Sequence, residues 1–216
     1  ILLTGSHMFE VLTFFKSHIE DSKILTQLNI GQKEYFVASI HREENVDDPE
    51  NLLSICQIFN EIACEFNKPV FVSTHPRTRK RLAQWSENVK FNPLVHFHPP
   101  FGFFDYLHLQ KNAICTISDS GTISEESAIL SFPAVTLRNA MERPEALDAG
   151  TIILTGINSK TVIDAIKLEI AEQDQGIRKH VPDEYRIRNT SWRVLKLIMG
   201  TAKLSNPWSG IKKPGE

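Results

Sequence analysis

The sequence AICTISDSGTISEE, residues 113–126, decides the fold that we expect for this chain. Its apolar run at 113–117 is typical of a strand that is buried on both faces of a parallel sheet. A turn of small residues follows the run, and residues 124–130 then predict a helix. A strand, a glycine turn and a helix in this order make the repeating unit of an open α/β sheet.

The same alternation of strands and helices extends outward in both directions. Short apolar runs predict further strands at residues 35–40, 68–74, 95–98, 134–137 and 151–154. Helical spacing and helix-start signals predict helices at residues 8–28, 51–66, 77–86, 103–112, 143–149, 160–173 and 184–202. The pattern predicts one Rossmann-like domain, a doubly wound parallel α/β sheet over residues 1–204, followed by a polar tail at 205–216.

Composition excludes several classes of protein. The 24 basic and 26 acidic residues give a net charge of −2, so nothing indicates nucleic acid or an anionic membrane as a partner. No apolar run approaches the roughly 18 residues of a membrane span, and no secretory leader is recognisable, so we expect a cytoplasmic protein. Cys56, Cys64 and Cys115 lack the spacing of a zinc or redox motif and are predicted to be buried free thiols.

Three polar segments follow predicted strands and carry the chemistry. They are HREEN at 41–45, SDSGTISEE at 118–126 and ERPE at 142–145. Because the carboxyl ends of parallel strands meet at one edge of an open sheet, these segments are expected to converge in the crevice there. Histidine, arginine, hydroxyls and carboxylates around a glycine turn suit a phosphorylated, polyhydroxylated ligand. A sugar nucleotide is the natural candidate.

The glycine turn at 118–122 opens a helix, whose first backbone N–H groups and dipole favour phosphate. Gly121 lets the backbone approach a ligand closely, and Ser120 can donate its hydroxyl. Glu125 and Glu126 follow about one turn later, where a carboxylate can accept hydrogen bonds from the two ribose hydroxyls. The same residues also suit an ordinary helix cap that binds nothing.

Cationic side chains at the other two segments leave two interpretations open. His41 can donate to a departing phosphate or transfer a proton near neutral pH, or it can be an ordinary histidine of a charged loop. Arg138 and Arg143 can clamp phosphate oxygens, or each can form a surface ion pair that contributes little. His96 and His98 share one face of a strand without a third ligand, so no metal site is predicted.

The remaining charged and aromatic clusters have ordinary structural interpretations. Residues 75–81 form a small basic patch, which we interpret as a solvated helix face because charge is balanced elsewhere. Aromatic side chains gather at 101–106, where Phe101, Phe103, Phe104 and Tyr106 are predicted to be mostly core residues. An aromatic ring near the crevice could also stack on a nucleotide base.

Taken together, HREEN (41–45), SDSGTISEES (118–127) and ERPEA (142–146) resemble the motifs of the non-hydrolysing UDP-N-acetylglucosamine 2-epimerase family, in the family's order. The resemblance extends over nearly the whole chain. PFGFFDY (100–106), the Thr122-Ile-Ser form of the glycine motif and the tail with Trp208 resemble one branch of that family. This branch is the UDP-2-acetamido-2,6-dideoxy-L-talose 2-epimerases, which make UDP-N-acetyl-L-fucosamine.

The resemblance implies the second domain of a two-domain glycosyltransferase-B architecture, with the N-terminal catalytic domain absent. Residues 1–7 would be the hinge, and 184–202 the terminal helix that packs back toward the first domain. The family's reaction eliminates UDP across C1–C2 and adds it back with inversion at C2, without a cofactor, for bacterial surface-polysaccharide precursors. Because the acids that handle the C2 proton lie in the first domain, this chain is expected to be inactive alone. The full-length protein is expected to be a homodimer.

The resemblance also implies roles for individual residues. His41 matches the catalytic histidine that assists at the leaving diphosphate, whereas Arg42 and His75 match a second, regulatory UDP-sugar site. Glu126 would hold the ribose, and Tyr106 would lie beside the uracil. The full set implied to bind UDP is Ser120, Gly121, Thr122, Glu126, Arg143 and Tyr106. Two alternatives stay open: a UDP-sugar glycosyltransferase domain of the same architecture, and a non-catalytic nucleotide-binding module.

Overall fold

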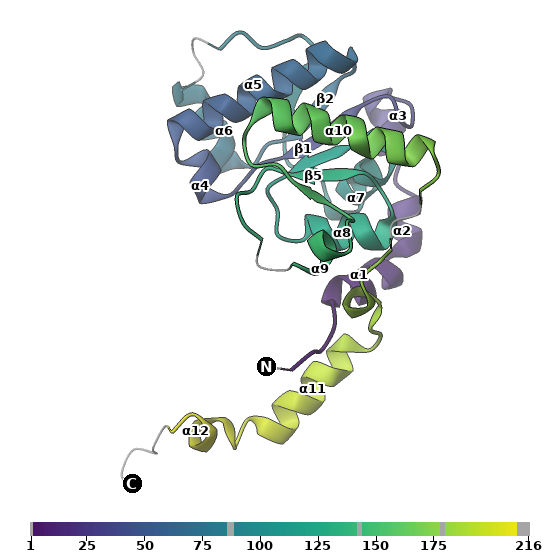
Figure 1. The fold of residues 1–216 in the computed structure, drawn as a ribbon, viewed down its shortest axis with the longest axis vertical. Helices are drawn as coiled ribbons and strands as arrows, with labels where there is room; N and C mark the ends of the chain where they lie inside the picture. The colour runs from purple at the N-terminus through teal and green to yellow at the C-terminus, as the bar shows by residue number, and fades with distance from the viewer. Residues whose placement is uncertain (1, 86–88, 142–143, 178–179, 211–216) are drawn as a thin grey trace.

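A computed structural model of the chain describes residues 2–85, 89–141, 144–177 and 180–210 (Figure 1). Its strands are β1 (Phe36–Ser39), β2 (Val70–Ser73), β3 (Val95–His98), β4 (Thr116–Ser118), β5 (Ala134–Thr136) and β6 (Ile153–Leu154). Within the described residues these six strands form one sheet, all pairs parallel, in the order β3-β2-β1-β4-β5-β6. The predicted doubly wound α/β sheet is confirmed, and each strand overlaps its predicted run, with boundaries that differ by up to three residues.

The strand order creates a topological switch point between β1 and β4. The chain builds outward from β1 to β3, returns to the middle of the sheet, and continues outward from β4 to β6. Val37 pairs with Thr116 and Ser39 pairs with Ser118, so β1 and β4 end side by side. Open α/β sheets bind their ligands at this point, because the loops that leave the two strands diverge there.

Helices cover both faces of the sheet (Figure 1). One face carries α5 (Pro49–Phe66) and α10 (Ser159–Asp174), which pack against each other. The other face carries α3 (Ile24–Leu28), α7 (Phe103–Asn112) and α8 (Ile123–Leu130). The remaining helical segments are α1 (His7–Phe14), α2 (Lys16–Glu20), α4 (Glu43–Val46), α6 (Pro76–Trp85), α9 (Glu145–Asp148), the 3-10 helix η1 (Asp183–Arg186), α11 (Thr190–Thr201) and α12 (Ser205–Trp208).

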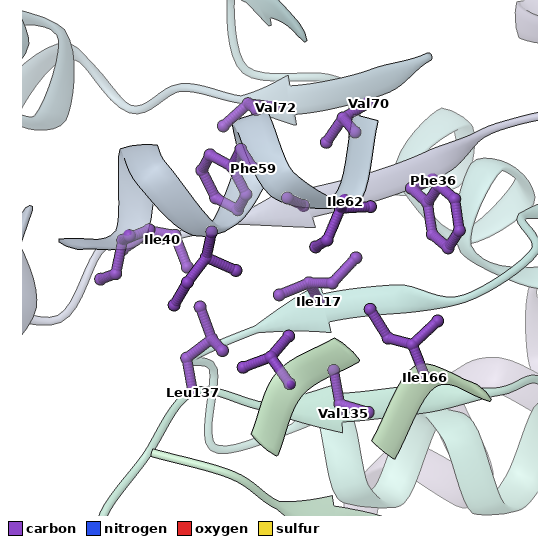
Figure 2. Close-up of a cluster of buried hydrophobic side chains, with 14 of the residues drawn as sticks. Phe36, Ile40, Phe59, Ile62, Val70, Val72, Ile117, Val135, Leu137 and Ile166 are labelled. Atoms are coloured by element: carbon purple, nitrogen blue, oxygen red, sulfur yellow. The ribbon is translucent and has the colours of Figure 1, made fainter. Parts of the chain in front are cut away.

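Alternating strand side chains fill the two cores. Phe36 joins the cluster beneath α5 and α10, whereas its neighbour Val37 joins the cluster beneath α3 and α7. Figure 2 shows the first cluster, to which Phe59 of α5, Ile166 of α10 and the strand residue Ile117 belong. Burial of each such side chain contributes about 1.5–3 kcal/mol. These contacts therefore stabilise the packing of α5 and α10 on the sheet.

Local signals account for the longest helix. Asp48 caps α5 by accepting a hydrogen bond from the Asn51 N–H at 3.0 Å, and Pro49 occupies its first turn. Asn67 ends the helix in the left-handed conformation, with φ of 49°. The helix thus begins two residues before the predicted start at 51 and ends at the predicted residue, Phe66.

Two predicted helices are divided in the structure. The helix expected over residues 8–28 is three helices, α1, α2 and α3, because the backbone leaves the helical region at Phe15 and at Lys23. The terminal helix expected at 184–202 consists of η1 and the separate helix α11. Asn189 separates them, because it adopts the left-handed conformation with φ of 61° immediately before α11.

Two short helices had no sequence prediction: α4 begins within the polar segment 41–45, and α12 lies in the tail. Two predictions about burial were wrong. Cys64 is exposed because it falls on the solvent side of α5, although Cys56 and Cys115 are buried free thiols as predicted. Phe103 is 47 % exposed because it is the first residue of α7 and extends beyond the core. No helix in the described part of the chain is long and apolar enough to cross a bilayer.

The N-terminal segment packs against the segment that leads into α11. The Ser6 N–H donates to the Glu184 carbonyl at 3.2 Å, and the Thr190 hydroxyl donates to the Thr4 carbonyl at 3.1 Å. Gly5, with φ of 95°, lies against Ile187. A Cβ added to Gly5 would stand only 2.5 Å from the Ile187 Cβ. Beyond this junction α11 extends away from the domain (Figure 1).

Candidate functional site

Asp119 holds the segment after β1 against the segment after β4. Its carboxylate accepts hydrogen bonds from the backbone N–H of His41, at 3.1 and 3.2 Å, and of Arg42, at 3.0 Å. Asn45 Nδ2 is a further donor at 3.1 Å. Asp119 is fully buried, so these donors replace the water that its carboxylate would otherwise bind. The two loops of the switch point therefore form one connected structure.

His41 and Arg42 place their side chains beside Asp119 in the connected loops. His41 Nδ1 lies 3.2 Å from Asp119 Oδ1, and its side chain is 47 % exposed. Arg42 Nε donates to the backbone carbonyl of Asp119 at 3.0 Å. Its Nη2 lies 3.8 Å from the point where a Cβ on Gly121 would stand, so the guanidinium reaches the glycine turn.

A second guanidinium group approaches the same turn from β5. Arg138, which follows β5, is buried and places Nη1 3.9 Å from the position of a Cβ on Gly121. Two guanidinium groups beside a glycine backbone can bind phosphate oxygens by charge-assisted hydrogen bonds. The sequence indicated Arg138 as a possible phosphate clamp, and the structure brings it to the glycine turn.

A chain of hydrogen bonds connects the glycine turn to the buried acid Glu126. The hydroxyls of Ser120 and Thr122 lie 3.0 Å apart, and the Thr122 hydroxyl donates to Glu126 Oε1 at 2.7 Å. Gln110 Nε2 donates to Glu126 Oε2 at 3.0 Å. Burial raises the pKa of Glu126, and the nearby charge of Glu125 adds to this effect. Four of the predicted UDP-binding residues, 120, 121, 122 and 126, are thus contiguous.

Tyr106 lies close to Glu126. Its hydroxyl is buried, and burial followed by the charge of Glu126 raises its pKa. Its neighbours in the structure are Ser39, the last residue of β1, and Gln110 on its own helix. The phenol therefore lies near Glu126 and the end of β1.

The other predicted residues are less closely connected. His75 is exposed just before α6, where its Nδ1 accepts from the Arg77 N–H at 3.3 Å. Helix α6 is tied to the site through the Thr78 hydroxyl, which donates to the Ile40 carbonyl at 3.0 Å. Arg143 lies outside the described residues, so the UDP contact predicted for it has no structural description.

Arg77, from the basic patch, forms ion pairs with acidic residues of the α4 segment. Its guanidinium contacts Glu43 at 2.7 Å and also pairs with Asp47. These hydrogen bonds raise the pKa of Arg77. Arg81 makes a further contact with Asp47 at 3.0 Å. The patch is therefore held by acidic neighbours on the segment that follows the first strand.

Sequence reasoning missed three residues that complete the site: Asp119, Asn45 and Gln110. Asp119 directly follows β4 at the switch point, and this position was a usable signal. Asn45 contacts Asp119 across 74 residues of sequence, and Gln110 contacts Glu126 across 16 residues. Neither position carries a sequence signal of its own, because both contacts depend on which elements become neighbours.

The fold and the site define a class: a doubly wound α/β domain whose glycine turn, guanidinium groups and buried acid gather at the switch point. The sequence pattern of the family described as UDP-N-acetylglucosamine 2-epimerase matches residues 1–199. The chain therefore belongs to this family.

Individual relatives agree with the family match. An enzyme of Methanocaldococcus jannaschii named UDP-N-acetylglucosamine 2-epimerase is 39 % identical over 62 % of this chain and 37 % of its own. The solved structure of the Rickettsia bellii enzyme matches with a TM-score of 0.78 and 36 % identity, over 97 % of this chain and 56 % of its own. The solved structure of the M. jannaschii enzyme in complex with UDP-GlcNAc and UDP matches with a TM-score of 0.80 and 29 % identity. The match covers 93 % of this chain and 55 % of that chain. The chain thus matches between 37 % and 56 % of the length of these relatives.

Proposed function

We propose that this chain is the UDP-binding half of a UDP-N-acetylamino-sugar 2-epimerase. The convergence of Arg42 and Arg138 on Gly121, one helical turn from buried Glu126, carries the proposal. A diphosphate at the glycine turn would meet both guanidinium groups. The ribose would then reach Glu126, whose carboxylate accepts a hydrogen bond from Thr122, the residue that follows Gly121. The Glu126 carboxylate has lone pairs beyond the two that Thr122 and Gln110 use, so it can accept from ribose hydroxyls.

In the reaction that we propose, UDP is eliminated across C1–C2 of the sugar and added back with inversion at C2. His41 would assist at the diphosphate, because it lies half-exposed beside the phosphate-binding turn and can donate a proton. The acids that exchange the C2 proton would come from a further domain. This chain alone is therefore expected to bind UDP without epimerising it.

An exposed apolar surface supports the need for that domain. Helix α11 presents a face, here named the α11 face, formed by Trp192, Leu195, Ile198 and Met199. All four side chains are at least 46 % exposed. A groove of about 600 Å³, lined by residues of α1 together with Arg188, Asn189 and Ser191, lies at the base of this helix. Such continuous apolar surface marks a contact with another protein surface, and we assign it to the domain that completes the relatives' length.

The finer features of the proposal follow from the family and its motifs. The substrate would be a UDP-amino sugar, and a Pseudomonas aeruginosa relative is named UDP-2,3-diacetamido-2,3-dideoxy-D-glucuronate 2-epimerase. The motif at 100–106 favours the L-talose branch. The protein would act as a homodimer in the cytoplasm on precursors of surface polysaccharides. A regulatory UDP-sugar at Arg42 and His75 would adjoin the first nucleotide, because Arg42 also faces the glycine turn.

Calorimetric titration of UDP into this chain tests the nucleotide site. We expect a Kd between about 1 µM and 1 mM, or about −8 to −4 kcal/mol, and loss of binding in Glu126→Ala. Glu50→Ala, which removes an exposed carboxylate from α5, is the matched control and keeps the affinity. Absence of binding by the folded chain, or equal affinity in Glu126→Ala, would refute the placement of UDP.

The reaction itself is tested on the full-length protein. NMR of the products should show the 2-epimer of the UDP-sugar, formed with exchange of the C2 hydrogen for deuterium from solvent. Sugar transfer to an acceptor without any 2-epimer would instead establish a glycosyltransferase. Full epimerase activity in a His41→Ala, Glu126→Ala double variant would show that this domain does not take part in catalysis.

A further inference from the structure

Asp119 is a buried charge whose side chain contacts His41, Arg42 and Asn45 across the switch point. Its side chain has no exposed surface, and its carboxylate takes backbone N–H donors from His41 and Arg42 and the Asn45 amide. The same carboxylate also faces the His41 ring, with Nδ1 at 3.2 Å from Oδ1. Its backbone carbonyl holds Arg42 Nε. One residue therefore sets the position of both cationic side chains after β1.

A purely structural role explains only part of this arrangement. Burial of a carboxylate is costly unless hydrogen bonds compensate it, and the backbone and amide donors supply that compensation. A neutral oxygen acceptor could hold the same backbone N–H groups without the cost of a charge. The contact with the imidazole is the one for which the negative charge matters, because it favours a proton on the nitrogen that faces it.

We propose that Asp119 is a positioning residue, which holds His41 with its proton on Nδ1 and leaves Nε2 to meet the phosphate of the ligand. This inference rests on the proposed function for the identity of the ligand. A neutral imidazole has one N–H, so a proton on Nδ1 makes Nε2 the free acceptor. A second proton taken up at Nε2 then points toward the departing phosphate. Buried aspartates set the tautomer of histidine in serine proteases by the same logic.

The tautomer of His41 can be measured directly in this chain. Two-bond proton–nitrogen NMR spectra of the 15N-labelled protein distinguish the two neutral tautomers, and His41→Gln identifies the signal of this residue. The spectra are recorded about two pH units above the ordinary imidazole pKa of about 6.5. We expect the Nδ1–H tautomer, which free histidine disfavours.

Asp119→Asn should then convert His41 to the Nε2–H tautomer. The amide oxygen of asparagine would keep the backbone N–H groups of His41 and Arg42, so its NH₂ group would face Nδ1 and donate to it. Glu44→Gln, which removes an exposed carboxylate from the same segment, is the matched control and should leave the tautomer unchanged. Circular dichroism checks that both variants keep the fold.

An Nε2–H tautomer in the unmodified chain would overturn the proposal, and so would an unchanged tautomer in folded Asp119→Asn. Measurement on the unmodified chain decides the question even if the variant fails to fold. Titration with UDP separates this inference from the proposed function. An Nδ1–H tautomer in a chain that does not bind UDP would sustain the role of Asp119 and reject the nucleotide as its ligand.

Discussion

At the scale of single residues, Gly121 is the point where three strand exits meet. Its backbone follows β4, while Arg42 arrives from β1 and Arg138 from β5. A Cβ placed there would contact both guanidinium groups at ordinary van der Waals distances, 3.8 and 3.9 Å. The protein alone can therefore accommodate a methyl group at this position. A phosphate between the two guanidinium groups would have to share that space with it.

Gly121→Ala should therefore separate binding from stability. We expect the free energy of unfolding to change by less than about 1 kcal/mol, whereas the Kd for UDP rises at least about tenfold, or 1.4 kcal/mol. Gly200→Ala on α11, where an added Cβ meets nothing, is the control and leaves UDP binding unchanged. Calorimetry and urea denaturation measure the two quantities. Undiminished affinity in Gly121→Ala would move the phosphate away from this turn.

Glu126 makes stability depend on pH in a direction that the structure decides. Because burial raises its pKa, the folded chain holds the proton of this carboxyl at pH values where the unfolded chain has released it. Stability from this group is thus lost as the pH rises from the unfolded pKa through the folded pKa. Glu126→Gln cannot ionise and should lack this loss.

Urea denaturation of the chain and of Glu126→Gln between about pH 4 and pH 8 measures this effect. The free energy of unfolding of Glu126→Gln minus that of the unmodified chain should grow with pH across the window and level off above it. Glu50→Gln, at an exposed position, supplies the control slope. If the difference in the free energy of unfolding did not change with pH, the pKa of Glu126 would be the same in the folded and the unfolded chain.

At the scale of elements, the start of α1 is coupled to α8. The Ser6 hydroxyl caps α1 by accepting from the Met8 N–H at 3.2 Å, and it donates to Glu125 Oε1 at 2.7 Å. Glu125 is buried beside Glu126 on α8. The N-terminal segment is therefore connected to the helix that carries the candidate ribose-binding acid.

Ser6→Ala should destabilise the chain by about 1–3 kcal/mol, because it removes a helix cap and leaves a buried carboxylate with one donor fewer. Thr13→Ala changes an exposed hydroxyl on the same helix and should cost much less. Urea denaturation of the two variants provides the comparison. Equal losses would show that the contact with Glu125 contributes nothing measurable.

At the scale of the whole molecule, two apolar regions of similar composition differ in what covers them. The cluster in Figure 2 consists of buried side chains from the strands, α5 and α10. The α11 face projects beyond the domain, with Ile198 57 % exposed. The contribution of an isoleucine to stability should therefore depend on its region and not on its chemistry.

The same substitution at two sites tests this difference. Ile166→Ala, in the buried cluster, should cost about 2–5 kcal/mol. Ile198→Ala, on the α11 face, should change the free energy of unfolding by no more than about 0.5 kcal/mol. Urea denaturation at two protein concentrations measures both. A large, concentration-dependent loss for Ile198→Ala would show that a second copy of the chain covers this face.

The sequence by itself determined the class of the fold, the positions of the strands, and the glycine turn that opens α8. These features are local: a strand buried on both faces needs a short apolar run, and a turn toward phosphate needs small residues. The same locality explains the failures at Phe15 and Asn189. A helical pattern continues through both positions, but the backbone leaves the helical conformation at Phe15 and is left-handed at Asn189.

Only the tertiary structure decided which polar residues meet. Asp119 reaches His41 across 78 residues of sequence because β4 lies beside β1 in the sheet, and no local pattern contains that strand order. The exposure of the α11 face was likewise undetermined, because apolar spacing marks a face to be covered without stating what covers it. Strand order and mutual covering are properties of the packed chain, and they convert scattered charges into one site.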